Sequence, residues 1–321
     1  MSEFNLIQKY FTHPTHHTNL GVGDDAALVT VAEGMQLVVS TDMSVAGTHF
    51  FHDAAPDDIS WKALAVNISD MAAMGAQAKW ATLAIALPEV NENWLAEFSR
   101  GFFACAEQFN IDLIGGDTTY GPLNISVTIM GEVPIGQAIK RSGAQVGDDI
   151  WVSGQIGSAA LGLAHLQGKI KLKSDVLQTS IHALCRPMPR ANLGLALRGI
   201  ATSCIDISDG LLADLGHILK ASNCGAIINL EKIPCVDYLK NNLTNPQFQE
   251  YLLAGGDDYE LCFTAPSSKR EAIIALGEKL NIPLNIIAAT HMAIGLESGG
   301  LQVMYQNKPL SLLKHGFDHF A

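Results

Sequence analysis

The stretch Asp206–Gly210, with the sequence DISDG, places one carboxylate at the end of a predicted strand and a second at the start of a predicted helix. Apolar residues at helical spacing from Leu211 to Leu219 indicate that helix. With Ser208 between the two aspartates, the stretch can hold a metal ion and can offer backbone N–H groups to a phosphate. Predicted strands and helices alternate on both sides of it, which favours a mixed α/β fold.

Aspartates recur in other short settings rich in Gly, Ser or Thr, namely Asp25 in GDDAA, Asp42 in STD, Asp70 in NISD and Asp117 in GGDTT. For a single aspartate in such a setting, a helix cap or a turn is the commonest role. Carboxylates that gather in one place, however, repel each other unless a cation lies among them. Lys and Arg are scarce near these motifs, so we expect a divalent metal that prefers oxygen ligands. Magnesium that carries a nucleotide is the predicted ligand.

The composition indicates a globular protein and excludes several classes. The chain has 321 residues, of which 48% are hydrophobic and 16% are charged, enough to fill the cores of two domains. Its net charge of −12 argues against nonspecific nucleic-acid binding. No apolar run is long enough to span a bilayer, and the first residues lack the pattern of a secretory signal. The six cysteines form no Cys-x-x-Cys pair, which favours a reducing cytoplasm over a disulfide framework or a zinc site.

Two domains are predicted, at residues 1–136 and 146–321, with a linker at 137–145 that contains glycines and basic residues. In the first domain, an apolar run predicts a buried strand at Gln36–Ser40. A helix from Asp57 to Met74 follows, on which Asn67 and Asp70 share a face.

Further strands and helices are predicted beyond this point. An apolar strand is expected at Trp80–Leu87, and a helix with an aromatic core-facing stripe follows it. A strand at Asp112–Ile114 is then expected to run into a loop that contains Gly116 and Asp117, where glycine lets a ligand approach the main chain. A hairpin turn is expected at Ser298–Gly300.

Two familiar nucleotide-binding patterns are nearly present. Gly21–Ala26 resembles the Rossmann glycine pattern, but it precedes an apolar, strand-like segment instead of a helix. Gly162–Lys169 has one residue too many for a Walker A loop, and Ile170 replaces the required Ser or Thr. Any ATP site is therefore predicted to lack a Walker A loop.

An ordered set of peptides resembles the thiamine-monophosphate kinase family, within the aminoimidazole-ribotide-synthetase-like ATP-binding superfamily. The peptides are GVGDDAA, STDM, VNISDMAAMGA, GGDTT, KRSGAQVGD, DISDGL, GGDDYEL and GFDHF, and they extend from about Gly21 to Phe320. The resemblance implies two α/β domains with mixed sheets and helices packed on them. It implies that the first domain binds ATP and Mg²⁺ and pairs with its copy in a homodimer. The implied reaction is phosphorylation of thiamine monophosphate to thiamine diphosphate with ATP.

The resemblance also implies roles for individual residues. Several Mg²⁺ ions would be bound by Asp25, Ser40, Thr41, Asp42, Asp70, Asp117, Asp206 and Asp209. ATP would be contacted by Gly116, Asp117, Arg141 and Ser208, and thiamine monophosphate by His49, Asp257 and Phe317.

Two of these positions depart from the family. The family more usually has Glu at position 257, so Asp257 has a shorter reach, and it often has Trp at position 317, so Phe317 offers a smaller stacking surface. Whether Asp257 or Asp258 contacts the substrate is left open by the sequence.

The residues fit the implied chemistry in their own right. The acceptor is a phosphate monoester with a second pKa of about 6, so it is largely dianionic at neutral pH and needs no general base. No residue is evidently set up as a base or a nucleophile. Direct in-line transfer of the γ-phosphoryl group is therefore expected, with Arg141 as a cation whose fork suits phosphate.

Other members of the superfamily are the alternatives. They are a purine cyclo-ligase, a selenophosphate synthetase and a hydrogenase-maturation dehydratase, and the last two use a reactive Cys or Sec near one terminus. This chain has no cysteine before Cys105. A non-catalytic nucleotide-binding regulator would be expected to lose some of the metal-binding aspartates, and all of them are present.

Overall fold

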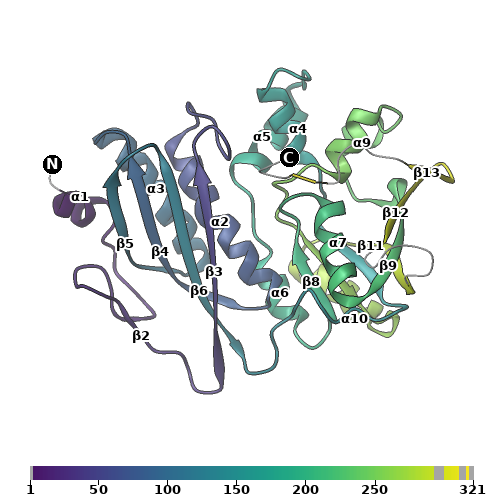
Figure 1. Cartoon of the computed structure of the whole chain (residues 1–321), viewed down its shortest axis with the longest axis horizontal. Coiled ribbons are helices and arrows are strands. Elements are labelled where there is room, and N and C mark those ends of the chain that lie inside the picture. Colours follow the sequence, from purple (N-terminus) through teal and green to yellow (C-terminus); the bar gives the residue numbers. More distant parts are fainter. Residues whose placement is uncertain (1–2, 293–299, 311–315, 318–321) are drawn as a thin grey trace. The chain divides into compact units, whose positions relative to one another are not determined.

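The computed structural model describes residues 3–292, 300–310 and 316–317. The chain forms two compact units (Figure 1), one from Met1–Met71 with Ala76–Gly136 and one from Ala72–Gly75 with Gln137–Ala321. Each unit has a mixed sheet with helices packed on it, which confirms the predicted fold class. No helix in the described residues is long and apolar enough to cross a membrane.

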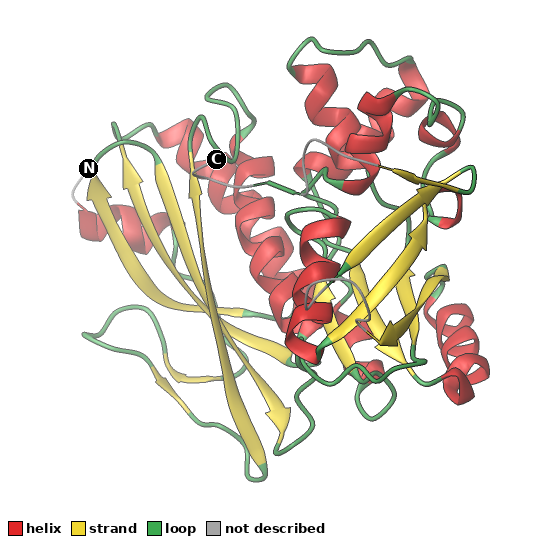
Figure 2. Cartoon of the chain, turned by 45° about the vertical axis from the view of Figure 1, so that its right-hand side comes forward, coloured by secondary structure: helices red, strands yellow, loops and turns green. Residues whose placement is uncertain are grey.

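The first unit is built on a sheet with the strand order β3-β6-β4-β5. Its elements are α1 (Glu3–Tyr10), β1 (Thr18–Leu20), β2 (Leu28–Val29), β3 (Met35–Val45), α2 (Pro56–Ala73), β4 (Gln77–Leu87), α3 (Glu92–Phe109), β5 (Asp112–Tyr120) and β6 (Asn124–Pro134). Strand β6 pairs antiparallel with β3 and β4, and β4 pairs parallel with β5. Helices α2 and α3 are the crossovers between parallel strands, so they lie on the same face of the sheet (Figure 2).

Local signals explain where these helices begin and end. Pro56 is the first residue of α2, where its missing N–H costs nothing. The side chain of Asn91 accepts N–H bonds at the start of α3, and Asn110 ends α3 in the left-handed conformation. Phe98 and Phe102 of α3 are fully buried, which confirms the predicted aromatic core-facing stripe.

Two predictions for this sheet are wrong. The strand at Gln36–Ser40 was expected to be buried, but β3 is an edge strand, and its side chains at Leu37 and Val39 are 45% and 53% exposed on the face without helices. The expected loop at Gly116 and Asp117 belongs to strand β5, which pairs with β4 up to Tyr120. An apolar run and a glycine pair are local patterns. Whether a strand is buried, and where it ends, depends on the strands that pair with it in the sheet.

The second unit is built on a larger mixed sheet with the strand order β13-β12-β9-β11-β7-β10-β8. Its elements are β7 (Asp149–Ser153), α4 (Ser158–Leu166), α5 (Ser174–Cys185), α6 (Ala191–Leu197), β8 (Ser203–Asp206), α7 (Leu211–Ser222), β9 (Cys224–Asn229), the 3₁₀ turn η1 (Leu230–Lys232), α8 (Asp237–Lys240), α9 (Pro246–Leu253), β10 (Leu261–Ala265), the 3₁₀ turn η2 (Ser267–Lys269), α10 (Arg270–Leu280), β11 (Leu284–Met292), β12 (Leu301–Tyr305) and β13 (Lys308–Leu310). Residues 298 and 299 of the expected hairpin turn lie outside the described residues.

Alternating residues of the central strands build a hydrophobic core on each face of this sheet. Ile150 and Val152 of β7 belong to one cluster, whereas Trp151 belongs to the other. Leu211 of α7 packs into the first cluster and Leu193 of α6 into the second. Because both faces of the sheet are covered, the central strands have continuous apolar sequences. Strand β8 is an edge strand of this sheet, and its last residue is Asp206.

Gly101 tests the packing of α2 against α3. A Cβ atom at Gly101 would overlap the carbonyl oxygen of Asp57 and the side chain of Ser60. We expect Gly101→Ala to lower the free energy of unfolding by about 1–3 kcal/mol, because the backbone of α2 must move. Gly216 of α7 has no atom within 4 Å of its missing Cβ, so Gly216→Ala should raise stability by about 0.5–1 kcal/mol. Urea titration of both variants measures this, and an unchanged Gly101→Ala would contradict the close approach.

Candidate active site

Ser40 and Asp70 join β3 to α2 on the helix-covered face of the first sheet. The Ser40 hydroxyl donates to Asp70 Oδ2 over 2.5 Å. Asp42 lies two residues beyond Ser40, so its side chain points to the same face. Near Asp70, Asn67 Oδ1 and Ser69 Oγ are buried without a hydrogen-bond partner among the described residues. The Ser40 hydroxyl and the Asp70 carboxylate are thus oxygen atoms, held side by side, of the kind that a hard cation prefers.

Thr41 and Asp117 lie on the opposite face of the sheet. The Thr41 hydroxyl is hydrogen-bonded to that of Thr128 on β6 over 2.8 Å. The register continues from Thr128 to Thr82 on β4, and Asp117 lies beside Ala84 on that same face. Three strand spacings separate Asp42 from Asp117, or about 14 Å. The two carboxylates of one chain therefore do not hold the same ion, and a contact from Thr41 would come from its main chain.

Gly116 gives β5 its shape beside Asp117. Its φ angle is 148°, and a Cβ atom there would overlap the carbonyl oxygen of Leu83. Only glycine therefore allows this close approach of β5 to β4, and Gly116 itself is exposed.

His49 lies in the turn after β3. Its Nδ1 accepts the N–H of Val45 over 3.0 Å, so a neutral ring carries its proton on Nε2. That nitrogen can donate to a phosphate oxygen.

Asp25 and Arg141 lie on exposed segments. Asp25 is in the loop that leads to β2, and its N–H bonds to the side chain of Asp24 over 2.8 Å. The carbonyl oxygen of Arg141 accepts the hydroxyl of Ser222 over 3.3 Å, while the residue itself is exposed.

In the second unit, the DISDG loop (residues 206–210) connects β8 to α7. Asp206 is 4% exposed and ends β8, whereas Ser208 and Asp209 are partly exposed. The N–H groups of Ser208, Asp209 and Gly210 all donate to Asp214 Oδ2, over 3.0, 3.1 and 3.1 Å. Burial raises the pKa of Asp214 to about 7, and the charge of Asp209 acts in the same direction, while the three N–H bonds oppose the shift.

The GGDDYEL segment (residues 255–261) is bonded directly to the DISDG loop. Asp257 N donates to Ser208 O over 2.9 Å, and Tyr259 N donates to Ile207 O over 2.8 Å. Phe317, near the end of the chain, donates its N–H to Asp209 O over 3.0 Å. Three segments that are remote in sequence thus form one hydrogen-bonded group, which the motifs alone did not reveal.

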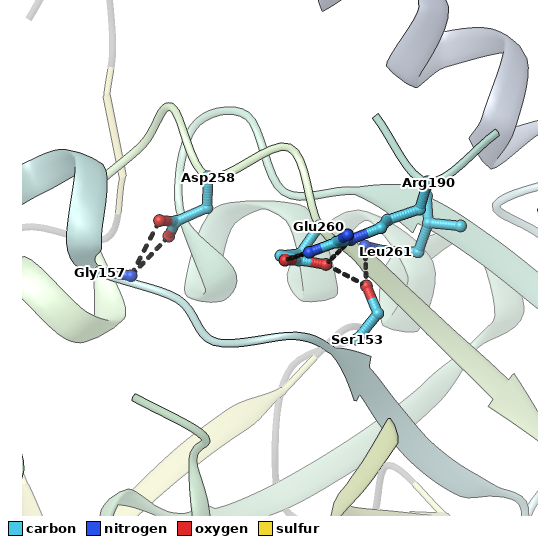
Figure 3. A network of polar contacts seen from close by, with 6 residues as sticks. All are labelled: Ser153, Gly157, Arg190, Asp258, Glu260 and Leu261. Carbon is cyan, nitrogen blue, oxygen red and sulfur yellow. Dashed lines mark hydrogen bonds and ion pairs between the residues drawn. The ribbon is translucent and has the colours of Figure 1, made fainter. Parts of the chain in front are cut away.

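The two aspartates of the GGDDYEL segment have different roles (Figure 3). The Asp258 carboxylate accepts the Gly157 N–H at 2.9 and 2.8 Å, and also that of Ala159, at the start of α4. Burial raises the pKa of Asp258 well above its usual value, although these N–H bonds favour the ionised form. Asp257 has a φ angle of 70°, a left-handed conformation that short polar residues tolerate best. The Asp258 carboxylate thus caps α4, whereas Asp257 Oδ1 accepts the Tyr259 hydroxyl over 3.1 Å within the segment itself.

Glu260 anchors the end of the same segment. Figure 3 shows its carboxylate between Arg190 and Ser153. Arg190 bonds both carboxylate oxygens, with Nε 2.6 Å from Oε2, and the Ser153 hydroxyl donates to Oε2 over 2.5 Å. Ser153 Oγ in turn accepts the Leu261 N–H over 2.9 Å. Sequence reasoning missed this network because its members lie far apart along the chain.

The donor set fits Mg²⁺. In the described part of the chain, no group of three or more His, Cys, Asp or Glu side chains converges on one point. Mg²⁺ is commonly bound by one or two carboxylates together with the phosphates of a substrate. The carboxylate and hydroxyl oxygens at Ser40, Asp70, Asp206 and Asp209 suit that mode of binding.

The segment Gly162–Lys169, which nearly matches a Walker A loop, does not form a phosphate-binding loop. Gly162 lies inside helix α4, and its missing Cβ would contact the backbone of Ser180. The first five residues of the segment are thus the end of a packed helix instead of a phosphate-binding loop.

Comparison with known proteins defines the class. The N-terminal domain of AIR synthase related proteins matches residues 23–133, and the C-terminal domain of the same proteins matches residues 145–290. The fold and the sequence thus define a two-domain protein of the AIR synthase related class.

Full-length relatives define the family within this class. The chain is 45% identical to the thiamine-monophosphate kinase of Salmonella typhimurium, with 99% of this chain and 98% of the relative covered. It is 46% identical to the enzyme of Escherichia coli strain K12 over the same shares. The chain belongs to the thiamine-monophosphate kinase family.

Solved structures of thiamine-monophosphate kinases have the same fold as this chain. The thiamine-monophosphate kinase of Stenotrophomonas maltophilia has a TM-score of 0.82 at 44% identity, with 96% of this chain and 95% of that chain covered. A structure described as AaThiL complexed with AMPPCP and TMP has a TM-score of 0.75 at 30% identity, with coverage of 93% and 92%.

Adjacent aspartates allow a sharp test of the GGDDYEL segment. We expect Asp258→Ala to lower the free energy of unfolding by about 0.5–2 kcal/mol, because α4 loses the acceptor at its start. Asp257→Asn should leave stability nearly unchanged, since Asn also tolerates the left-handed conformation. Thermal and urea unfolding of both variants measures the difference. Equal effects of the two substitutions would contradict the assigned roles.

Proposed function

We propose that this chain transfers the γ-phosphoryl group of ATP to thiamine monophosphate and forms thiamine diphosphate. The observation that carries the proposal is the hydrogen-bonded group of the DISDG loop, the GGDDYEL segment and Phe317. In it, the residues assigned by resemblance to Mg²⁺ and ATP are bonded directly to those assigned to the thiamine phosphate. The full-length identity to thiamine-monophosphate kinases and the AMPPCP and TMP complex of a relative support the same conclusion.

Each unit would contribute oxygen atoms as metal ligands. Asp42, Asp70 and Ser40 would hold Mg²⁺ in the first unit, and Asp206 and Asp209 in the second; Asp25, Thr41 and Asp117 would supply further contacts. Bound Mg²⁺ supplies charge neutralisation between the two polyanionic substrates and on the transferring phosphoryl group. The protein contributes position, since the DISDG loop and β3 are both fixed by hydrogen bonds.

The other residues orient the two substrates. We assign Gly116, Arg141 and Ser208 to ATP, and His49 to the phosphate of thiamine monophosphate, to which its Nε2 donates. Phe317 is 51% exposed, so its ring is accessible to a thiazolium cation, and such a cation–π contact is worth about 0.5–2 kcal/mol. The acceptor phosphate is already largely dianionic, so direct in-line transfer proceeds without a protein base.

The first test is formation of product. Purified protein incubated with ATP, Mg²⁺ and thiamine monophosphate should yield thiamine diphosphate, separated from the other thiamine esters by chromatography. We expect Asp42→Asn and Asp209→Asn each to lower kcat/KM by more than about 100-fold, because even indirect losses at a metal site cost about 10–100-fold. Glu278→Gln, on exposed helix α10, is the control and should be fully active. Binding of ATP by the wild type without any diphosphate product would overturn the proposal.

We infer a homodimer that forms through the helix-free face of the first sheet. Leu37, Val39 and Met43 of β3 are 45%, 53% and 54% exposed on that face, although they are large and apolar. Asp117 faces the same way, so pairing would place its carboxylate near the partner copy. An apolar patch on a sheet face is a common mark of a protein interface.

Val39→Asp tests the dimer. A charge at the centre of this face should be expelled from the interface, so we expect the variant to be a monomer in size-exclusion chromatography with light scattering. Ile274 of α10 is 51% exposed, and Ile274→Asp should leave the mass unchanged. A Val39→Asp variant that still elutes as a dimer would show that another surface is used.

A cytoplasmic location is proposed as well. All six cysteines lie in the described residues, and none of them forms a disulfide bond. Chains that fold in oxidising compartments commonly pair their cysteines, whereas free thiols are typical of the reducing cytoplasm.

A further inference from the structure

Asp214 lies in the first turn of α7, outside the motifs that carry the proposed function. It is only 2% exposed, and Leu211 and Leu215 on the same helix are completely buried. Helix packing therefore fixes the position of this carboxylate. A carboxylate in the first turn of a helix is also favoured by the helix dipole.

The Asp214 carboxylate organises the main chain of the DISDG loop. Three consecutive N–H groups, those of residues 208, 209 and 210, converge on the single oxygen Oδ2 at 3.0–3.1 Å. The carbonyl groups of two of these residues are bonded to other segments. Ser208 O accepts the N–H of Asp257, and Asp209 O accepts that of Phe317.

The N–H groups of residues 208–210 thus bond to the helix, and the carbonyl groups of Ser208 and Asp209 bond to the segments assigned to the thiamine phosphate. If Oδ2 were lost, three N–H groups would need new partners, and one of them, in Gly210, is buried. A buried N–H without an acceptor is unfavourable, so the loop would rotate to find other acceptors. Such a rotation would move Asp209 and both carbonyl groups together.

We propose that Asp214 is a positioning residue that sets the DISDG loop so that Mg²⁺–nucleotide binding and thiamine-phosphate binding depend on the same carboxylate. Asp214 itself touches neither substrate. The proposal rests on the proposed kinase function for its catalytic part, while its binding part requires only that the loop takes part in Mg²⁺–nucleotide binding.

Two substitutions at Asp214 are compared with one matched control. Asp214→Asn keeps one acceptor oxygen without the charge, and Asp214→Ala removes the acceptor. The control is Asp148→Asn, because Asp148 is also buried and its Oδ2 accepts the Gln145 N–H over 2.8 Å and the Thr202 hydroxyl over 2.7 Å. Thr202 precedes β8, so these bonds lie at the opposite end of that strand from Asp206.

Two readouts are measured on the full-length protein. The first is calorimetric affinity for a non-hydrolysable ATP analogue at several Mg²⁺ concentrations. The second is the steady-state KM for thiamine monophosphate and the Mg²⁺ concentration that gives half-maximal rate. Thermal unfolding of every variant shows whether it is folded at the assay temperature.

We expect Asp214→Ala to weaken Mg²⁺-dependent binding of the analogue and to raise the KM for thiamine monophosphate, each by about 10- to 100-fold. Asp214→Asn should fall between Asp214→Ala and the wild type, and Asp148→Asn should match the wild type in both readouts despite a lower Tm. If Asp214→Ala does not fold, the difference between Asp214→Asn and Asp148→Asn decides.

The proposal is overturned if folded Asp214 variants bind and turn over as the wild type does, or if Asp148→Asn shows the same losses. Failure of the kinase function is distinguishable from failure of this inference. A wild type that makes no thiamine diphosphate would remove the kinase function, and the calorimetric comparison would still decide whether Asp214 sets the nucleotide-binding loop.

Discussion

Backbone hydrogen bonds of Ile207 and Ser208 with the GGDDYEL segment set the geometry on which the site of the second unit depends. They join the end of an edge strand to a segment that begins some fifty residues later, and the same loop also holds the N–H of Phe317. Side chains that we assign to one reaction are thereby placed by main-chain contacts, which tolerate changes of side chain. Asp214, Glu260 and Asp258 then fix these segments to α7, to Arg190 and to α4.

In the first unit, the candidate site residues are positioned by a β-sheet instead of by loops. Strand β3 has Ser40 and Asp42 on one face and Thr41 on the other, because the side chains of a strand alternate. A single short motif therefore serves both the helix-covered face, where Asp70 lies, and the open face, where Asp117 lies. If the open face pairs with a second copy, the division of these residues between two faces is what allows one strand to serve two partners.

Much of this arrangement can be predicted from the sequence, and the failures have physical causes. Helical spacing identified α2 and α3, and the alternation of strands and helices identified the fold class, because both depend on local patterns. The burial expected for Gln36–Ser40 failed because an apolar run does not say whether the covering surface belongs to the same chain. Gly116 was taken for a loop residue, yet a strand at a sheet edge can bend at a glycine. The sequence did not predict that Asp214 accepts the N–H groups of residues 208–210, because a carboxylate in a helix gives no local sign that it bonds to the loop before that helix.

The left-handed backbone at Asp257 bears on the choice between aspartate and glutamate at this position. Among residues other than glycine, Asp and Asn adopt positive φ most readily, since their short side chains can bond to the local backbone. Glutamate would extend the carboxylate by one methylene group but would gain less from this conformation. Asp257 thus has an unstrained backbone and a side chain one methylene group shorter than that of glutamate. A substrate held by the Asp257 carboxylate must therefore lie closer to the main chain.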